Sequence, residues 1–388
     1  MHRDTKTIFL DHHATTPVDP EVVEAMLPYF STHFGNPSGT ETASGRRAAE
    51  AVSTAREQVA ELLNAEPAEI IFTSGATEAN NLAILGTLAA LQERTPRRTV
   101  LTTPVEHKTV LGPFEIIARR SFRVVMLPVT STGRVDLEPA RALFNEDSLL
   151  LSVQLASNEI GTIQPLPELI SLAHEYGALV HTDAAQAAGK VPIDIVSLGV
   201  DLLSLSAHKF NGPKGVGALY LRNGPRSFPI EPRLIGGAQE QGLRAGTINV
   251  PGVVGLGVAA TLAKNDLGRL PTRLAWMRDA FENALLGFDS TLTRNGDLVH
   301  RLPNNSSITF CGIEAQVLIQ HLPELELSSG AACTSGAPEP SHVLQAIGLS
   351  REDAYSTLRF GWGRTNTLND SIKAADQIQR AVTALRKT

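Results

Sequence analysis

The strongest constraint on the fold is a series of short apolar runs that alternate with helical patterns. The runs are residues 70–72, 100–101, 124–126, 149–153, 178–181, 202–205 and 216–221. Because apolar and polar residues do not alternate within them, we expect strands that are covered on both faces. Strands that alternate with helices predict an α/β fold, with a mostly parallel sheet between layers of helices.

Apolar spacing also predicts individual helices and a change of architecture. Asp19 followed by Pro20 favours the start of a helix. After about residue 265 the pattern changes to a long helix over 270–286, polar strand-like segments such as 306–310 and further helices over 314–322 and 371–385. We therefore expect a large α/β domain up to about residue 264 and a smaller α+β domain after it. One apolar stripe of an early helix consists of Ala48, Val52, Ala55, Val59, Leu62 and Leu63.

Composition argues against several classes of protein. With 34 Lys and Arg against 40 Asp and Glu, the net charge of −6 disfavours binding of nucleic acid or an anionic membrane through net charge. No stretch approaches the ~20 apolar residues of a membrane span, and residues 1–6 lack a signal-peptide core. Two cysteines, Cys311 and Cys333, cannot form a disulfide framework or a metal cluster. We expect a cytoplasmic protein without a metal site.

Lys209 is the first candidate for chemistry. It follows the run 202–205, so it lies at the carboxyl edge of the expected sheet, where open α/β sheets bind ligands. A lysine in a partly dry environment can lose its proton and form a Schiff base. The alternative is an ordinary surface lysine. The unusual turn over residues 212–217 favours the functional interpretation.

Three further segments follow strands in the same way, and each allows two interpretations. Asp183 could pair with a protonated ring nitrogen, as pyridoxal phosphate requires, or cap a helix. The small-residue turn over 73–78 could bind a phosphate with free backbone N–H groups, or be a simple capped turn. His107 could stack on a flat ring or move protons, or be a structural histidine.

The two cysteines differ in their surroundings. Cys333 lies among small residues over 328–338, which predicts a mobile loop that could carry a thiol between a substrate and a partner. Cys311 ends the strand-like run 306–311, so we expect it to be a buried apolar residue. For Cys333 alone, a reactive and an unreactive thiol are equally compatible with the sequence.

Taken together, these segments resemble cysteine desulfurases of the iron–sulfur-cluster and nitrogen-fixation type, which are fold-type-I pyridoxal-phosphate enzymes of the class V aminotransferase family. The resemblance extends over nearly the whole chain, from residues 10–17 to residues 358–364. Its most specific segments are residues 72–78, 158–161, 206–217, 244–247 and 328–335. It implies a seven-stranded, mostly parallel sheet in a cofactor-binding domain over 15–264, and a small α+β domain formed by 1–14 and 265–388.

The resemblance also implies a role for each matching residue. Lys209 would be the Schiff-base lysine, Cys333 the nucleophile, and His107 would stack on the cofactor ring and transfer protons. Asn158 and Arg359 would bind the substrate, Arg359 by gripping its carboxylate. The remaining cofactor contacts would be Asp183 to the pyridine nitrogen, Gln186 and Asn158 beside the phenolic oxygen, Ala76, Thr77, Ser206 and His208 to the phosphate, and Thr247 to the phosphate in the other subunit.

The implied reaction converts L-cysteine to L-alanine in a homodimer and leaves the sulfur on Cys333 as a persulfide for a protein acceptor or scaffold. His12, His13, Thr42 and Ser157 depart from the family pattern and bear on substrate entry and partner choice. Two alternatives stay open. One is a selenocysteine lyase or another fold-type-I enzyme. The other is a non-catalytic sulfur-relay scaffold, which would have no use for Lys209 and its partners.

Overall fold

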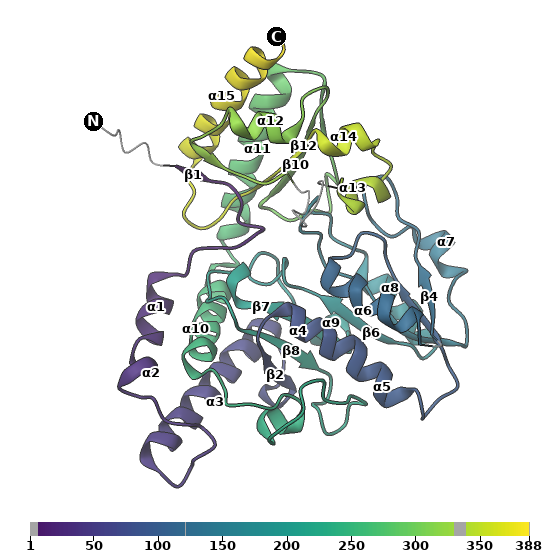
Figure 1. Ribbon diagram of the computed structural model, residues 1–388, viewed down its shortest axis with the longest axis vertical. Coiled ribbons are helices and arrows are strands. Elements are labelled where there is room, and N and C mark those ends of the chain that lie inside the picture. Colours follow the sequence, from purple (N-terminus) through teal and green to yellow (C-terminus); the bar gives the residue numbers. More distant parts are fainter. Residues whose placement is uncertain (1–6, 121, 330–338, 388) are drawn as a thin grey trace.

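A seven-stranded sheet forms the centre of the larger part of the molecule, in a computed structural model that describes residues 7–120, 122–329 and 339–387 (Figure 1). The strand order is β2-β8-β7-β6-β5-β3-β4. Only β8 runs against the others, because it pairs antiparallel with both β2 and β7. The predicted mostly parallel sheet is therefore confirmed. Its strands are β2 (Ile70–Thr73), β3 (Thr99–Thr102), β4 (Arg123–Met126), β5 (Ser148–Ser152), β6 (Leu179–Asp183), β7 (Leu202–Ser206) and β8 (Gly217–Leu221).

Successive side chains of these strands enter two different cores. Leu203 and Leu205 pack in one apolar cluster and Leu202 in another, as the two-residue period of a strand requires. The expectation of strands covered on both faces fails at β4, where Arg123 and Met126 are exposed. β4 is one of the two edge strands and pairs with β3 alone, whereas the other edge strand, β2, is buried throughout. Helices therefore cover both faces of the central strands.

The first of these cores contains helices from both ends of the larger part. Its helices include α3 (Ala43–Leu63), α8 (Leu166–Glu175) and α10 (Val250–Asp266), and the predicted apolar stripe of α3 is buried. Asp19 caps α1 (Pro20–Met26), since its carboxylate accepts a hydrogen bond of 3.1 Å from the Glu21 N–H. A short helix, α2 (Pro28–Ser31), follows α1. The opposite core contains α4 (Ala76–Asn81), α5 (Thr87–Leu91) and α6 (Lys108–Ala118).

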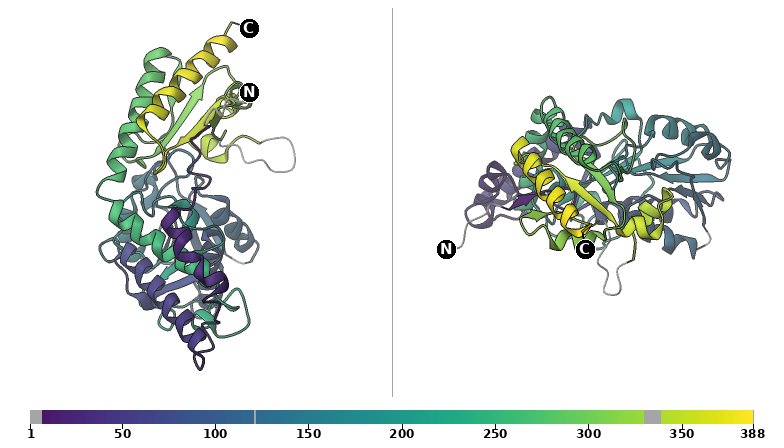
Figure 2. Two further views of the ribbon diagram at one scale, coloured as in Figure 1. Left: turned by 90° about the vertical axis from the view of Figure 1, so that its left-hand side faces the viewer. Right: turned by 90° about the horizontal axis from the view of Figure 1, so that it is seen from above.

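The smaller part contains an antiparallel sheet of β9 (Leu292–Arg294), β10 (Asn305–Phe310) and β12 (Thr357–Gly361). Helices α11 (Leu270–Phe288) and α15 (Leu368–Leu385) pack side by side against it (Figure 2). Phe281 lies at the centre of this core, 4.8 Å from the Phe360 ring and 5.2 Å from the Trp362 ring. The N-terminal strand β1 (Ile8–Phe9) pairs with β11 (Leu325–Glu326) in a separate two-stranded sheet, which packs against the same apolar core.

The predicted domain boundary remains a prediction. Ile8 and Leu10 pack in the same apolar cluster as α11 and α15. A separate cluster, however, joins Val105 and Ile160 to Val343 and Leu344 across the proposed division. The remaining short helices are α7 (Leu137–Arg141), α9 (Ile195–Leu198), α12 (Ala315–Gln320), α13 (His342–Ala346) and α14 (Arg351–Tyr355).

The expectation for Cys311 was wrong. Its side chain is exposed, because β10 ends at Phe310 and the chain turns at Gly312, which has a φ of 78°. Cys333 lies outside the described residues. Within the described ranges, no helix has the length and apolar character needed to cross a membrane.

Candidate active site

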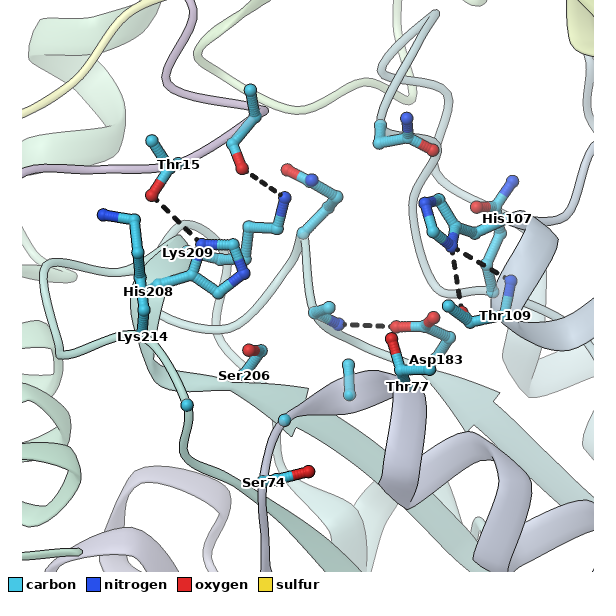
Figure 3. Close-up of a pocket in the computed structure, with 18 of the residues that line it drawn as sticks. Thr15, Ser74, Thr77, His107, Thr109, Asp183, Ser206, His208, Lys209 and Lys214 are labelled. Carbon is cyan, nitrogen blue, oxygen red and sulfur yellow. Dashed lines mark hydrogen bonds between the residues drawn. The ribbon is translucent and has the colours of Figure 1, made fainter. Parts of the chain in front are cut away.

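One pocket of about 450 Å³ gathers most of the residues that the sequence singled out (Figure 3). It lies where β2, β6 and β7 end, as the rule for ligands at open α/β sheets predicts. Figure 3 shows Lys209 and His208 on one side and Asp183 and His107 on the other. The lining includes Ala76, Thr77, His107, Asn158, Asp183, Gln186, Ser206, His208 and Lys209, together with Ala14, Thr15, Ser74, Gly75, Thr109, Gln154, Ala156, Ala185, Lys214 and Gly215.

Two hydrogen bonds hold the Asp183 carboxylate. Its Oδ1 accepts from the Ala185 N–H at 2.9 Å, and its Oδ2 accepts from the Asn80 amide at 2.7 Å. Asn80 is fully buried in α4 and also donates to the Thr109 hydroxyl at 2.9 Å. No Lys or Arg pairs with Asp183 among the residues that the structure describes. The carboxylate is thus oriented and can face a cation supplied by a ligand.

The amine of Lys209 lies half-buried beside a backbone segment. Its Nζ donates to the carbonyl oxygens of His13 at 2.6 Å and Ala14 at 2.9 Å. Burial, followed by the positive charge of Arg359, lowers the Lys209 pKa to about 8. The Asp183 charge opposes this shift only in part. At neutral pH about a tenth of this lysine is therefore an uncharged, nucleophilic amine, far more than of an ordinary lysine.

The turn that enters α4 has the geometry of an anion cradle. Gly75 has a φ of 148°, which favours glycine, and the first N–H groups of the following helix have no acceptor within it. The Glu78 carboxylate fixes the turn by accepting from the Ser74 N–H at 2.8 Å and from Arg244 at 3.0 Å. Ser206 lies across from Gly75. These groups fit a phosphate, which needs several donors in one concave site.

The histidines of the pocket are held by hydroxyl groups. His107 caps α6, since its Nδ1 accepts from the Thr109 N–H at 3.2 Å and lies 2.9 Å from the Thr109 hydroxyl. Burial lowers the His107 pKa, although the Asp183 charge opposes this effect. The Nδ1 of His208 lies 3.1 Å from the Thr15 hydroxyl, and burial together with nearby lysines lowers the His208 pKa to about 4. Both rings are thus uncharged near neutral pH, as stacking or hydrogen bonding to a cofactor requires.

Arg359 reaches the site from the small sheet. Its guanidinium donates to the Asn158 carbonyl oxygen at 3.1 Å and pairs with Asp11 at 2.6 Å. Its backbone N–H donates to the Ser328 carbonyl oxygen at 2.9 Å. Arg359 does not line the pocket itself but touches a residue that does. Thr247 is exposed and does not line this pocket either.

The donor set fits pyridoxal phosphate. Lys209 offers an amine, Asp183 an oriented carboxylate with room for a cationic ring nitrogen, and the turn before α4 offers N–H groups for a phosphate. Sequence reasoning missed Asn80 and Gln154. Asn80 follows the predicted phosphate turn by a few residues, so the sequence could have indicated it. No sequence pattern indicates Gln154, because its side chain donates to the Val105 carbonyl oxygen, a contact that depends on the fold. No cluster of three metal-binding side chains occurs within the described ranges.

Comparisons with known proteins agree with this geometry. The model of the class-V aminotransferase family matches residues 8–372. The chain is 44% identical over 360 residues to cysteine desulfurase IscS of Anaeromyxobacter dehalogenans (strain 2CP-C), covering 93% of this chain and 88% of that protein. A solved NifS-like protein superposes with a TM-score of 0.90 at 35% identity, covering 97% of this chain and 99% of that one. SspA in complex with cysteine gives a TM-score of 0.80 at 35% identity, covering 92% and 98%. The chain belongs to the cysteine desulfurase family, within the class-V aminotransferases.

Proposed function

We propose that this protein is a pyridoxal-phosphate-dependent cysteine desulfurase that converts L-cysteine to L-alanine and leaves the sulfur on Cys333 as a persulfide. The observation that carries the proposal is the single pocket that joins the Lys209 amine, the Asp183 carboxylate and the N–H cradle before α4. Membership of the family supports the reaction, and the similarity to SspA in complex with cysteine supports the substrate.

Different residues of the pocket would hold different parts of the cofactor. Lys209 would hold it covalently, Asp183 would pair with its ring nitrogen, and His107 would stack on the ring. Bound pyridoxal phosphate supplies an electron sink that stabilises negative charge at the substrate α-carbon. The other contacts would come from Ala76, Thr77, Asn158, Gln186, Ser206 and His208, which line the same pocket.

The protein's own groups would bind the substrate and move its protons. Arg359 and Asn158 would hold the substrate carboxylate, which Arg359 can grip with two parallel N–H groups. The Lys209 amine is neutral in about a tenth of molecules near pH 7 and in about half near pH 8, so it can accept the α-proton and return it later. His107 would accept the proton of the Cys333 thiol, because only the thiolate is nucleophilic.

The sulfur transfer is balanced without an added oxidant. The Cys333 thiolate attacks the substrate sulfur, so a sulfur–sulfur bond forms while the bond between that sulfur and the β-carbon breaks. The electron pair left on the β-carbon takes up a proton, which completes the methyl group of alanine. Described residues on both sides of Cys333 are hydrogen-bonded close to the proposed substrate-binding residues. The Ser328 carbonyl oxygen accepts from the Arg359 backbone N–H, and the Ser341 hydroxyl donates to the carboxylate of Glu159, which follows Asn158.

The test is the intact mass of the protein after brief incubation with L-cysteine, with alanine assayed in the same samples. The wild type should gain the mass of one sulfur atom and release alanine, and C333A should do neither. C311A is the matched control, since it removes the exposed cysteine outside the site and should behave as the wild type. Equal alanine from wild type and C333A would favour the selenocysteine-lyase alternative. A cofactor-loaded wild type that forms no alanine would contradict the substrate assignment.

We further propose that the protein is a cytoplasmic homodimer that passes its sulfur to an acceptor or scaffold protein, as in iron–sulfur-cluster assembly. The proposed role of Thr247, contact with the phosphate in the other subunit, fits its exposed position outside its own pocket. Phe30, Phe34 and Ile235 are 64, 75 and 87% exposed, which supports an apolar interface. Light scattering should give twice the mass of one chain, and a monomer would contradict this part of the proposal.

A further inference from the structure

The outer edge of β2 is closed by two side chains instead of a neighbouring strand. Within the described ranges β2 pairs with β8 alone, so one row of its backbone N–H and C=O groups faces away from the sheet. On this edge the Glu240 carboxylate accepts from the Phe72 N–H at 2.7 Å, and the Arg56 guanidinium donates to the Ile70 carbonyl oxygen. Two charged side chains thus take the place of a strand where β2 leads into the pocket.

Arg56 and Glu240 also form a two-pronged ion pair with each other. The Nη2 of Arg56 lies 2.7 Å from the Oε1 of Glu240, and its Nη1 lies 3.0 Å from the Oε2. The Glu240 side chain is 2% exposed, and the Arg56 guanidinium lies 4.6 Å from the centre of the Phe72 ring. A buried carboxylate is costly unless it is paired and hydrogen-bonded. The contacts to Arg56 and the Phe72 N–H meet this need, so they fix the orientation of Glu240.

The backbone that carries Glu240 has an unfavourable conformation. Glu240 and Gln241 have φ angles of 47° and 56°, in the left-handed region that residues other than glycine seldom adopt. Such conformations persist only where the surrounding contacts hold them, and they concentrate near functional sites. The Gln239 side-chain oxygen closes the loop by accepting from the Gly246 N–H at 3.0 Å. The ion pair with Arg56 therefore holds a loop whose backbone is strained.

The same loop also holds the turn between β2 and α4. Arg244 follows Glu240 by four residues and donates to the Glu78 carboxylate at 3.0 Å. Glu78 in turn accepts from the Ser74 N–H at 2.8 Å. The strand before the turn is therefore bonded to Glu240, and the turn itself is bonded through Glu78 to Arg244. One loop fixes the turn from both sides.

We propose that Glu240, held by Arg56, is a positioning residue for the phosphate group of the cofactor. Neither residue lines the pocket, whereas Ser74 and Thr77 do (Figure 3). Phe72 precedes Ser74 by two residues, so a shift of the Phe72 backbone would displace the N–H groups that the turn offers to a phosphate. Binding groups need such supporting contacts to keep their geometry. The inference rests on the proposed pyridoxal-phosphate site and concerns the phosphate end of it alone.

The test compares pyridoxal phosphate with pyridoxal, which has the same ring and aldehyde but no phosphate. Each is titrated into the full-length, cofactor-free protein, and visible absorbance gives its affinity. E240Q keeps the size of the side chain but turns an N–H donor toward Arg56 or the Phe72 N–H, which need an acceptor. The affinity for pyridoxal phosphate should fall about tenfold, while that for pyridoxal stays within about twofold. E61Q, which breaks an exposed pair with Lys264 on the helix of Arg56, should match the wild type for both.

A milder variant and a measurement on the wild type keep the test decisive if E240Q does not fold. R56K keeps the charge but loses the planar fork, so the ratio of the two affinities should fall about threefold. In the wild type the Phe72 amide should be protected from hydrogen exchange, and R56K should weaken that protection. An unchanged ratio in folded E240Q or R56K, an equal loss for both ligands, or an unprotected Phe72 amide overturns the inference. A wild type that binds pyridoxal phosphate no more tightly than pyridoxal overturns the proposed phosphate site instead.

Discussion

Replacement of Asn80 by alanine tests how the site orients its carboxylate. Asn80 donates the shorter of the two hydrogen bonds to Asp183, 2.7 Å against 2.9 Å from the Ala185 N–H. In N80A the Asp183 Oδ2 loses this donor, while the carboxylate stays buried. A hydrogen bond to a charged group contributes about 1.5–3 kcal/mol. Since the second bond remains, we expect a loss of about 2 kcal/mol, or roughly 30-fold, in the affinity for pyridoxal phosphate.

The assay is equilibrium dialysis of pyridoxal phosphate against the full-length protein, with alanine formation measured at saturating cofactor. The matched control is N81A. Asn81 is the next residue of the same helix, but its amide donates only to the Thr77 carbonyl oxygen one turn earlier, at 2.9 Å. N81A should therefore bind the cofactor within about twofold of the wild type. If N80A and N81A lose the same affinity while both remain folded, Asn80 does not support Asp183 and the reasoning is refuted.

Three further predictions concern stability and substrate binding. Burial lowers the His181 pKa to about 3, so the ring stays unprotonated in the folded protein but gains a proton in the unfolded chain below about pH 6.5. The free energy of unfolding should therefore fall by about 2 kcal/mol from pH 7 to pH 5, and thermal unfolding of H181Q should depend less on pH. E282A removes the buried carboxylate that pairs with Arg301 and Arg294 and leaves Arg301 only the half-exposed Asp279 at 3.3 Å, so it should cost about 3 kcal/mol in urea unfolding. D376A, which breaks an exposed pair, should cost under about 1 kcal/mol. R359K keeps the charge at residue 359 but loses the planar fork, so KM for cysteine should rise about tenfold with cofactor affinity unchanged; an unchanged KM would exclude contact with the carboxylate.

The sequence predicted those site residues whose positions follow from local order. Asp183 ends β6, the turn before α4 follows β2 directly, and Lys209 lies three residues after β7, with all three strands in one sheet. Because the carboxyl ends of parallel strands lie at one edge of the sheet, residues that follow different strands come close together in space. The apolar runs carried this information because they were long enough to identify β2, β6 and β7 without any tertiary contact.

The remaining parts of the site depend on contacts between distant segments. Arg359 pairs with Asp11 across 348 positions, and Lys209 bonds to His13 across 196. No periodicity encodes such pairs, since they arise when the N-terminal segment passes between the two parts of the molecule. Cys311 failed for a related reason: the strand pattern predicted burial, but the strand ends one residue earlier.

The same long-range contacts explain how Lys209 can be a weaker base before substrate binds and a stronger base afterwards. Arg359 is the charged group that lowers the Lys209 pKa most, after burial. A substrate carboxylate held by Arg359 would offset that charge, raise the Lys209 pKa and strengthen the amine as a base when the α-proton must leave. In R359M the positive charge is absent, so the Lys209 pKa should rise. The pH midpoint for the reaction of the cofactor-free protein with pyridoxal phosphate, followed by visible absorbance, should then move to higher pH. R359K should keep this midpoint near that of the wild type. Equal midpoints in R359M and R359K would show that burial alone sets the Lys209 pKa, and that substrate binding cannot tune it through Arg359.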